Sequence, residues 1–231
     1  MNIEILQLLE GAKNATGITV IIDVFRAFSV EAYLFDGGAE KIIPVADLEL
    51  AYNYKKALPT ALLVGERGGA KCEGFDFGNS PSDIIGTDLS GKTIIHTTSA
   101  GTQGLYGAKN AKVILGAGLV NAKATAEYIK KSGFTDVSLV CMGLAAVSPT
   151  DEDTLCAEYI KSLLENKPFE LEEKIENLKY TSGAKFFDEN QKDVFPTNDF
   201  YLCTKVDRFD FAMRLTKTEQ GLLYMKKEKT L

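Results

Sequence analysis

The amino-acid sequence predicts an α/β protein: a mostly parallel sheet flanked by helices, followed by a loop-rich C-terminal extension. Two observations lead to this fold class. Short apolar runs rich in β-branched residues, such as residues 18–22 (ITVII), do not alternate with polar residues and are typical of strands buried on both faces. Segments with helical periodicity separate these runs, and regular alternation of strands and helices is the pattern of a parallel sheet covered by helices.

The individual elements follow in chain order. We expect strands at residues 18–22, 41–45, 60–64, 93–96, 112–115 and 137–141. Helices are expected at residues 27–35, 48–58, 101–108 and 121–131, and from Thr150 or Asp151 to about residue 165. Asp47 is a good N-cap for the second helix, and Gly133 ends the fourth. Pro44 cannot donate a ladder hydrogen bond, which predicts an edge position for the strand at 41–45.

The 231 residues are predicted to form a single domain, because the length exceeds the usual ~150 residues per domain by too little for two. The main sheet is expected to occupy about residues 1–168. From residue 171 the strand–helix pattern ends: residues 171–178 are a candidate helix, and residues 186–231 resemble loops with aromatic anchors. We therefore expect residues 169–231 to pack on the sheet as an extension. Such an aromatic-rich segment also suits packing between subunits, which leaves a homo-oligomer open.

Charge and composition exclude several classes of protein. The 26 basic and 32 acidic residues give a net charge of −6 without any Lys/Arg block, so generic nucleic-acid binding has no electrostatic basis. The sequence contains no run of 18 apolar residues, so it predicts no membrane span. The single histidine, His96, argues against multi-histidine metal sites and Ser-His-Asp catalysis. The four cysteines are widely spaced, which predicts reduced thiols and a cytoplasmic protein.

Polar and glycine residues follow the ends of nearly all the predicted strands. In an open α/β sheet, ligands bind beyond the carboxyl ends of the strands, so these residues are candidates for one shared site. They are Asp23 and Arg26 after the first strand, Glu66 and Arg67 after the third, residues 97–102 (TTSAGT) after the fourth, Asn121 after the fifth and residues 151–153 after the sixth. The loop at residues 65–88 is longer than most, which also indicates function.

Residues 97–102 predict a binding site for an anion. A hydroxyl-rich turn that leads into a helix offers side-chain donors, free N–H groups and partial positive charge. Arg26 and Arg67 are suited to grip phosphate, carboxylate or sulfonate with paired hydrogen bonds. Each feature has a structural alternative, because the turn can be a plain helix cap and each arginine can form an ion pair, for example with Glu66.

Three acidic residues, at positions 151–153, lie at the start of a predicted helix. They complement the helix dipole, and they equally offer ligands for Mg²⁺, which takes a few carboxylates, waters and substrate phosphate and needs no histidine. Asp23 suits either a place in such a metal site or the cap of the helix after it. The residues alone thus predict a phosphate- or sulfonate-sized anion held with magnesium, and they do not choose between phosphoryl transfer and binding.

Six segments, in order along the chain, resemble the 2-phosphosulfolactate phosphatase family. They are residues 20–27 (VIIDVFRA), 65–69 (GERGG), 74–81 (GFDFGNSP), 97–102, 152–157 (EDTLCA) and a C-terminal motif with residues 195–196, Asp199, Cys203 and residues 206–207. Together they extend over nearly the whole chain. Two features differ from the family pattern. Residues 97–102 are one residue longer than in many members, and residues 143–150 lack the basic residue expected before Glu152.

The resemblance implies an α/β phosphatase that uses Mg²⁺ to remove phosphate from 2-phospho-3-sulfolactate, a step of coenzyme M biosynthesis. We expect Glu152 and Asp153, with Asp23, to hold the metal. The residues expected to act in catalysis are Asp23, Arg26, Glu66 and Arg67, with the two arginines clamping the small anionic substrate. The residues expected to bind phosphate or substrate are Asn79, Ser80, Thr97, Thr98, Ser99, Gly101, Thr102 and Asn121.

Three alternatives stay open at this point. The nucleophile is either Asp23 itself, which would form an aspartyl-phosphate, or a water molecule. A haloacid-dehalogenase-like phosphatase would also place a nucleophilic aspartate after an apolar strand, but it would carry a second aspartate two residues on, where Phe25 stands. A non-catalytic sensor of phosphorylated ligands would use the same anion loop without magnesium or the Glu152–Asp153 pair.

Overall fold

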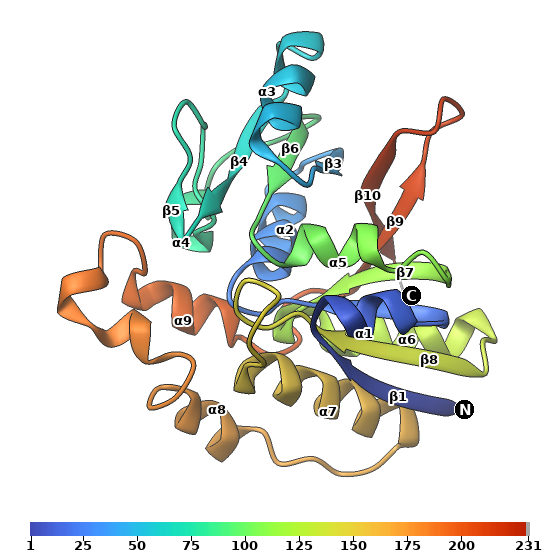
Figure 1. The fold of residues 1–231 in the computed structure, drawn as a ribbon. Coiled ribbons are helices and arrows are strands. Elements are labelled where there is room, and N and C mark those ends of the chain that lie inside the picture. Colours follow the sequence, from blue (N-terminus) through green and yellow to red (C-terminus); the bar gives the residue numbers. More distant parts are fainter. Residues whose placement is uncertain (230–231) are drawn as a thin grey trace.

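The computed structural model describes residues 1–229 and confirms the α/β fold class (Figure 1). Within these residues, ten strands form one sheet in the order β1-β8-β2-β7-β9-β10-β3-β6-β4-β5. The strands are β1 (Asn2–Gln7), β2 (Gly17–Ile22), β3 (Lys41–Pro44), β4 (Leu62–Arg67), β5 (Ala70–Lys71), β6 (Thr93–Thr97), β7 (Ala111–Ala117), β8 (Asp136–Cys141), β9 (Phe211–Lys217) and β10 (Leu223–Lys229). The helices are α1 (Leu8–Asn14), α2 (Ala27–Asp36), α3 (Leu48–Ala57), α4 (Pro81–Ile84), α5 (Gly101–Gly107), α6 (Ala122–Ser132), α7 (Asp151–Glu165), α8 (Glu172–Leu178) and α9 (Thr197–Cys203). Residues 230–231, the end of the predicted extension, lie outside the described residues.

The expected strands and helices are confirmed, with differences only at their ends. Asp47 caps α3, because its side chain accepts a hydrogen bond from the Leu50 N–H at 2.7 Å. Gly133 ends α6 with a left-handed φ of 74°. β1 and α1 were not predicted from the sequence. The strand β1 lies at the edge of the sheet and is half exposed, so it lacks the long apolar run that identified the central strands.

A C-terminal hairpin, β9–β10, lies inside the sheet between two groups of parallel strands (Figure 1). β1, β8, β2 and β7 form one parallel group, β3, β6 and β4 form the other, and β9 pairs antiparallel with β7. The prediction of a loop-rich extension is therefore wrong for residues 211–229, which add two strands to the main sheet. Charged residues in both strands break up the apolar pattern that would have revealed them.

The predicted edge position of Pro44 is also wrong. β3 lies between β10 and β6, and Pro44 is in register with His96 of β6. On the other side, β10 pairs with β3 only at Ile42, through Met225. Because the β10 pairing has ended before Pro44, the missing N–H of the proline removes no ladder bond on that side.

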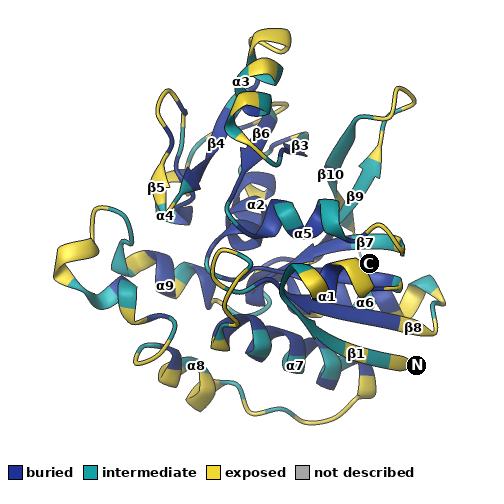
Figure 2. Ribbon diagram, in the orientation of Figure 1, coloured by how far each residue is buried: buried dark blue, intermediate teal, exposed yellow. Residues whose placement is uncertain are grey.

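Helices cover both faces of the sheet, and the central strands are buried on both sides (Figure 2). Adjacent residues of β2 show this directly: Ile21 packs in a core with Phe28 of α2, whereas Ile22 packs in a second core with Ile160 of α7. Side chains alternate across a strand, so a strand buried on both faces needs an apolar residue at each position. This constraint explains the continuous apolar run from which β2 was predicted.

The segment at residues 169–210 wraps around the carboxyl ends of the first strand group (Figure 1). It contains α8, two 3₁₀ turns (Ala184–Phe187 and Glu189–Gln191) and α9, held by a small aromatic core that includes Phe186 and Phe200. Phe25, just after β2, packs against Phe186 with ring centroids 5.0 Å apart. This contact brings the extension to the strand ends where the candidate residues lie. Among residues 1–229, no helix has the length and apolar character to cross a membrane.

Candidate active site

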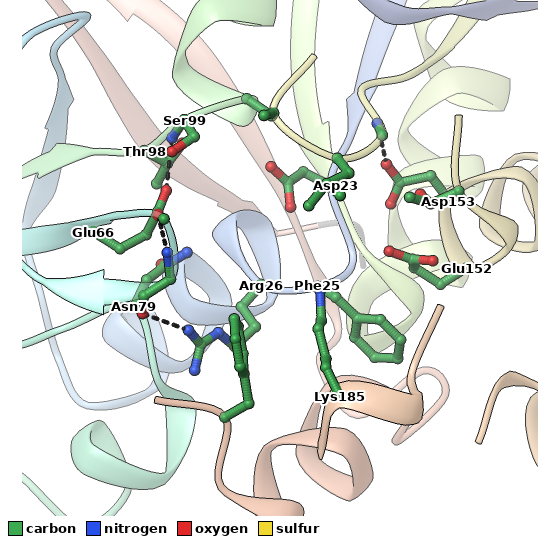
Figure 3. Close-up of a pocket in the computed structure, with 18 of the residues that line it drawn as sticks. Asp23, Phe25, Arg26, Glu66, Asn79, Thr98, Ser99, Glu152, Asp153 and Lys185 are labelled. Carbon is green, nitrogen blue, oxygen red and sulfur yellow. Dashed lines mark hydrogen bonds between the residues drawn. The ribbon is translucent and has the colours of Figure 1, made fainter. Parts of the chain in front are cut away.

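One pocket of about 320 Å³ opens at the carboxyl ends of β2, β4 and β8, between the sheet and the C-terminal extension (Figure 3). The structure brings together there many of the residues that the sequence analysis selected. Those that line the pocket are Asp23, Arg26, Glu66, Asn79, Thr98, Ser99, Glu152 and Asp153. In Figure 3, Asp23 lies between a wall with Glu66 and Ser99 and a wall with Glu152 and Asp153. The strand ends therefore do meet at one site, as the parallel topology requires.

Asp153, buried at the start of α7, ties two strand ends together. Its Oδ1 accepts a hydrogen bond from the Val24 N–H after β2, and its Oδ2 accepts one from the Gly143 N–H after β8, both at 2.8 Å. Asp23 caps α2, because its Oδ1 accepts from the Ala27 N–H at 3.1 Å. These backbone N–H groups hold both carboxylates in place at the pocket wall.

Glu152 is the least satisfied of the pocket carboxylates. It is buried, and its Oε2 has no hydrogen-bond partner in the described part of the chain. Burial raises the pKa of Glu152, and it raises the pKa of Asp153 well above its usual range, with repulsion from Glu152 and Asp23 adding to the effect on Asp153. An unpartnered buried oxygen beside other carboxylates is a suitable ligand for a cation.

Burial also raises the pKa of Asp23, from 3.8 to about 6. Repulsion from Glu66 and Glu152 adds to this shift, whereas the Ala27 N–H and the positive charge of Lys185 oppose it. The cause of the shift is therefore a concentration of negative charge in a space with little water. Such a pocket favours either protons or a bound cation.

Glu66 holds the hydroxyl-rich loop against the loop after β4. Its Oε1 accepts from the Ser99 N–H and its Oε2 from the Gly69 N–H, each at 2.7 Å. Glu66 thus positions both loops at the pocket wall, and its predicted part in catalysis stays a prediction. Gly101 allows a close approach, since a Cβ built there would lie 3.0 Å from Oδ2 of Asp23. The protein groups that approach Gly101 are therefore Asp23 and Ala27, whose Cβ would lie 2.9 Å away, and Gly101 itself does not line the pocket.

Several predicted substrate ligands face away from the pocket. The Thr102 N–H donates to Oγ1 of Thr98 at 3.3 Å, and the hydroxyl of Thr102 donates to the backbone oxygen of Thr98 at 3.0 Å, so the buried Thr102 side chain holds the turn before α5. Asn121 accepts from the Gly118 N–H at 3.0 Å and closes the turn after β7. Ser80 donates to Asp199 at 2.9 Å. Thr102, Asn121 and Ser80 do not line the pocket, and their side chains form hydrogen bonds with other protein groups.

Arg67 also differs from the expectation that it clamps the substrate. Its guanidinium donates to the backbone oxygen of Glu66 at 2.6 Å and to Oγ1 of Thr97 at 2.9 Å, and neither Arg67 nor Thr97 lines the pocket. Because side chains alternate along β4, the residue after the pocket-lining Glu66 points to the other face of the sheet. In this geometry Arg67 is therefore not placed to clamp a substrate together with Arg26.

Arg26 lines the pocket, but its guanidinium joins the extension to the sheet. Nη1 donates to Oδ2 of Asp199 at 2.8 Å and to the Val194 oxygen at 2.9 Å, and Nη2 donates to the Gly69 oxygen at 2.9 Å. The guanidinium also lies 4.8 Å from the ring centroid of Phe195. Arg26 and Asp199 are both buried, so the charge of Arg26 is balanced before any ligand binds. The structural alternative stated for this arginine is the one that the geometry favours.

The cation that the sequence analysis missed is Lys185, in the 3₁₀ turn Ala184–Phe187 (Figure 3). Its Nζ lies 5.2 Å from the ring centroid of Phe195 and 5.5 Å from that of Phe186. Within residues 1–229, no carboxylate lies within ion-pair distance of its ammonium group. One lysine in a loop-rich segment carries no sequence signal of a site. Lys185 and part of the segment 143–150, which lacks the expected basic residue, line the same pocket.

Comparison with known proteins identifies the family. A model of the 2-phosphosulpholactate phosphatase family matches residues 4–218. The chain belongs to this family. It is 36% identical over 200 residues to a Bacillus subtilis (strain 168) protein named "Probable 2-phosphosulfolactate phosphatase", covering 86% of each chain. Proteins of the same name from Carboxydothermus hydrogenoformans (43% over 173 residues; 74% of this chain, 71% of the relative) and Thermoplasma volcanium (32% over 207 residues; 89% and 93%) are also similar.

The pocket of this 2-phosphosulpholactate phosphatase family member fits a hard divalent cation in its chemistry. Across the described residues, no three His, Cys, Asp or Glu side chains form a ready-made metal cage. Mg²⁺ does not require one, since it keeps several waters and takes one or two carboxylates together with substrate phosphate. The unpartnered Oε2 of Glu152, beside Asp23 and Asp153, supplies ligands of that kind.

If the Arg26–Asp199 pair is structural, breaking it should destabilise the fold. Replacement of one partner leaves a buried charge unpaired, so we expect Arg26→Met and Asp199→Leu each to lower the free energy of unfolding by about 3–5 kcal/mol. The double variant should lose less than the sum of the two. Urea unfolding of the three variants measures this. Lys192→Ala, which removes an exposed ion pair with Glu189, is the control and should change little. If Arg26→Met is as stable as the wild type and only ligand binding is weakened, Arg26 binds the substrate, as the sequence predicted, and the structural interpretation is wrong.

The raised pKa of Asp23 predicts a pH-dependent loss of stability in the metal-free protein. Between pH 3.8 and about 6 the native state binds more protons than the unfolded state, so stability falls as the pH rises through this window and the penalty persists above it. A shift of this size corresponds to at most about 3 kcal/mol. Asp23→Asn keeps the cap oxygen and should be more stable than the wild type at pH 8 but not at pH 4. Urea unfolding at pH 4 and pH 8 in the presence of a chelator measures the free energies of unfolding of both proteins. The same stability difference between variant and wild type at the two pH values would contradict the raised pKa of Asp23.

Proposed function

We propose that the chain is a magnesium-dependent phosphatase that hydrolyses 2-phospho-3-sulfolactate to sulfolactate and phosphate. The observation that carries this proposal is the pairing of opposite chemistries in one pocket. Buried carboxylates suited to a metal lie on one wall, and hydroxyl, amide and ammonium donors suited to anions lie around them. Family membership and the names of the relatives support the phosphatase class.

The anionic substrate would be held mainly by groups that are not already paired. Lys185 provides a positive charge, and Thr98, Ser99 and Asn79 provide neutral donors at the pocket wall. A pocket of about 320 Å³ suits a small molecule of this kind. Because Arg26 and Arg67 are held by protein groups, the substrate's charge would be met by Lys185 and by a bound cation.

Glu152 would be the main metal ligand, with Asp23 and Asp153 adjacent. Mg²⁺ bound there would supply charge neutralisation at a phosphate oxygen and a bound water with a lowered pKa. Asp153 would keep its hydrogen bonds to the strand-end N–H groups and fix the position of Glu152 next to it on α7.

Attack by Asp23 and attack by water are both compatible with the pocket. Asp23 uses Oδ1 to cap α2, and its other oxygen, Oδ2, lies near Gly101 beside the hydroxyl loop. A carboxyl with a pKa near 6 is also suited to accept a proton from water at neutral pH. Trapping of an aspartyl-phosphate, lost in Asp23→Asn, would favour direct attack.

All four cysteines are free and buried, and they lie apart from the pocket wall. Reduced thiols of this kind fit a reducing compartment, so we infer that the enzyme acts in the cytoplasm.

Phosphate release from 2-phospho-3-sulfolactate is the direct test of the proposed function. We expect release with Mg²⁺ and none with a chelator. Glu152→Gln should raise the Mg²⁺ concentration needed for half-maximal rate by ~10-fold or more, because it removes the unpartnered carboxylate. Glu158→Gln is the matched control on the same helix, since Glu158 pairs with Lys174 at the surface. Binding of the substrate without release under any divalent metal would support the non-catalytic sensor instead.

Lys185 provides a second test of the proposed substrate site. A hydrogen bond to a charged group is worth ~1.5–3 kcal/mol, so Lys185→Gln should raise KM by ~10-fold or more with a smaller change in kcat. Lys192→Gln, a charge change at an exposed position nearby in the chain, should leave KM unchanged. Steady-state kinetics at saturating Mg²⁺ measures both. An unchanged KM in Lys185→Gln would exclude the ammonium group from substrate binding.

A further inference from the structure

We propose that Asn79 binds an anionic oxygen of the substrate through its side-chain NH₂ group, and that a buried Glu31–His96 pair fixes this orientation. The inference rests on the proposed function in one respect, because it assumes that the ligand of the pocket is an anion. Glu31 and His96 do not line the pocket and are positioning residues. Only Asn79 would touch the ligand.

The three side chains form a continuous hydrogen-bonded chain from the interior to the pocket. Oε1 of Glu31, on α2, lies 2.9 Å from Nδ1 of His96 on β6. Nε2 of His96 lies 3.2 Å from Oδ1 of Asn79. Glu31 and His96 are fully buried, and Asn79, 5% exposed, lines the pocket. The only histidine of the chain thus connects a buried acid with the pocket wall.

The contact with Glu31 favours a proton on Nε2 of His96. Glu31 lies in the apolar interior, and in residues 1–229 its Oε2 has no hydrogen-bond partner. Burial of a lone carboxylate is costly, and the imidazole at 2.9 Å is the group placed to balance it. Two arrangements make the pair neutral overall: a carboxylate against an imidazolium, and a carboxyl group that donates to Nδ1 of a neutral imidazole. In both of them Nε2 carries a proton. An imidazole protonated on Nδ1 alone would leave the carboxylate charge uncompensated.

The proton on Nε2 in turn determines what the pocket wall offers to a ligand. With Nε2 protonated, His96 donates to Oδ1 of Asn79, and Nδ2 of Asn79 faces the pocket. The structure provides no acceptor for Nδ2 among the described residues, so both of its hydrogens are available to a ligand. With Nε2 unprotonated, the amide would turn to donate to it, and the carbonyl oxygen would face the pocket. That orientation would repel a phosphate or sulfonate oxygen.

The place of Asn79 suits the anionic group that lies away from the metal. Figure 3 shows Asn79 beside Glu66 on the wall opposite Glu152 and Asp153. A phosphate near the carboxylate wall would leave a second anionic group directed to the Asn79 wall. The shared chemistry is an oxygen of a phosphate or a sulfonate, and the test below uses one probe of each kind.

The protonation of His96 is measurable in the intact protein without a variant. Because the chain has one histidine, ¹⁵N labelling of the imidazole gives a single pair of ring nitrogens in the NMR spectrum. We expect Nε2 to carry a proton, because it faces Oδ1 of Asn79. In Glu31→Gln, where an imidazole protonated on Nδ1 no longer leaves a buried charge uncompensated, we expect the proton on Nε2 to be partly lost. An unprotonated Nε2 in the wild-type protein overturns the proposal, whatever the stability of the variant.

The contact with the ligand is tested on the Asn79 side-chain amide signals, assigned by their absence in Asn79→Asp. Inorganic phosphate and 3-sulfolactate are added separately, and we expect at least one to shift both NH₂ protons. In steady-state assays, Asn79→Asp keeps the oxygen that faces His96 and places a negative oxygen toward the pocket, so KM should rise by ~10-fold or more. Asn53→Asp makes the same charge change at an exposed position of α3 and should not alter KM. An unchanged KM and unmoved signals with both probes overturn the proposal.

The two proposals fail in different ways. If the protein releases no phosphate but a proton on Nε2 of His96 and shifted Asn79 signals are seen, the phosphatase assignment fails and the Asn79 assignment stands. If the protein is an active phosphatase with an unprotonated Nε2, this inference fails and the proposed function stands. The NMR measurements do not depend on turnover, which makes the distinction direct.

Discussion

The negative charge buried at the carboxyl ends of the strands is the constraint on which the site depends. Asp153 and Glu66 use their oxygens to tie neighbouring loops together through backbone N–H groups, and Asp23 caps a helix. These bonds build the pocket, but they also place several carboxylates around a small volume. An anion will enter such a space only if positive charge comes with it or is already present. The ammonium group of Lys185 is one such charge at the pocket, and the metal proposed at Glu152 would be another.

The C-terminal part of the chain completes this site in two ways. The hairpin β9–β10 joins the two parallel groups into one sheet, and the segment before it covers the pocket and supplies Lys185. The ion pair between Arg26 and Asp199 connects that segment to the strand end next to Asp23. An arginine suits this task because its planar group donates in several directions at once, to a carboxylate and to two backbone oxygens. The pocket is therefore assembled from distant parts of the sequence and not from the first parallel group alone.

Local signals in the sequence predicted most of the elements and half of the pocket wall. The apolar run of β2 and the acidic start of α7 are features of neighbouring residues, so Asp23, Glu152 and Asp153 were found correctly as neighbours of one pocket. The hairpin and Lys185 were missed because their roles depend on contacts with distant segments. Direction was the other source of error: Arg67 follows a strand end as predicted, yet the alternation of side chains along β4 turns it away from the pocket.

Glu31 was not selected from the sequence, although its context is unusual, because its partner lies 65 residues away in the chain. Its neighbours in α2 are apolar and buried on all sides of the helix, so an acidic residue there needs a partner inside the protein. Within residues 1–229 that partner is His96, the single histidine of the chain, whose Nδ1 lies 2.9 Å from Oε1 of Glu31. A core pair kept for stability alone could be replaced by apolar residues without loss. Its contact with a pocket-lining amide gives the pair a consequence beyond stability. By favouring a proton on Nε2 of His96, Glu31 determines that the NH₂ group of Asn79 is the part of the amide that faces the pocket.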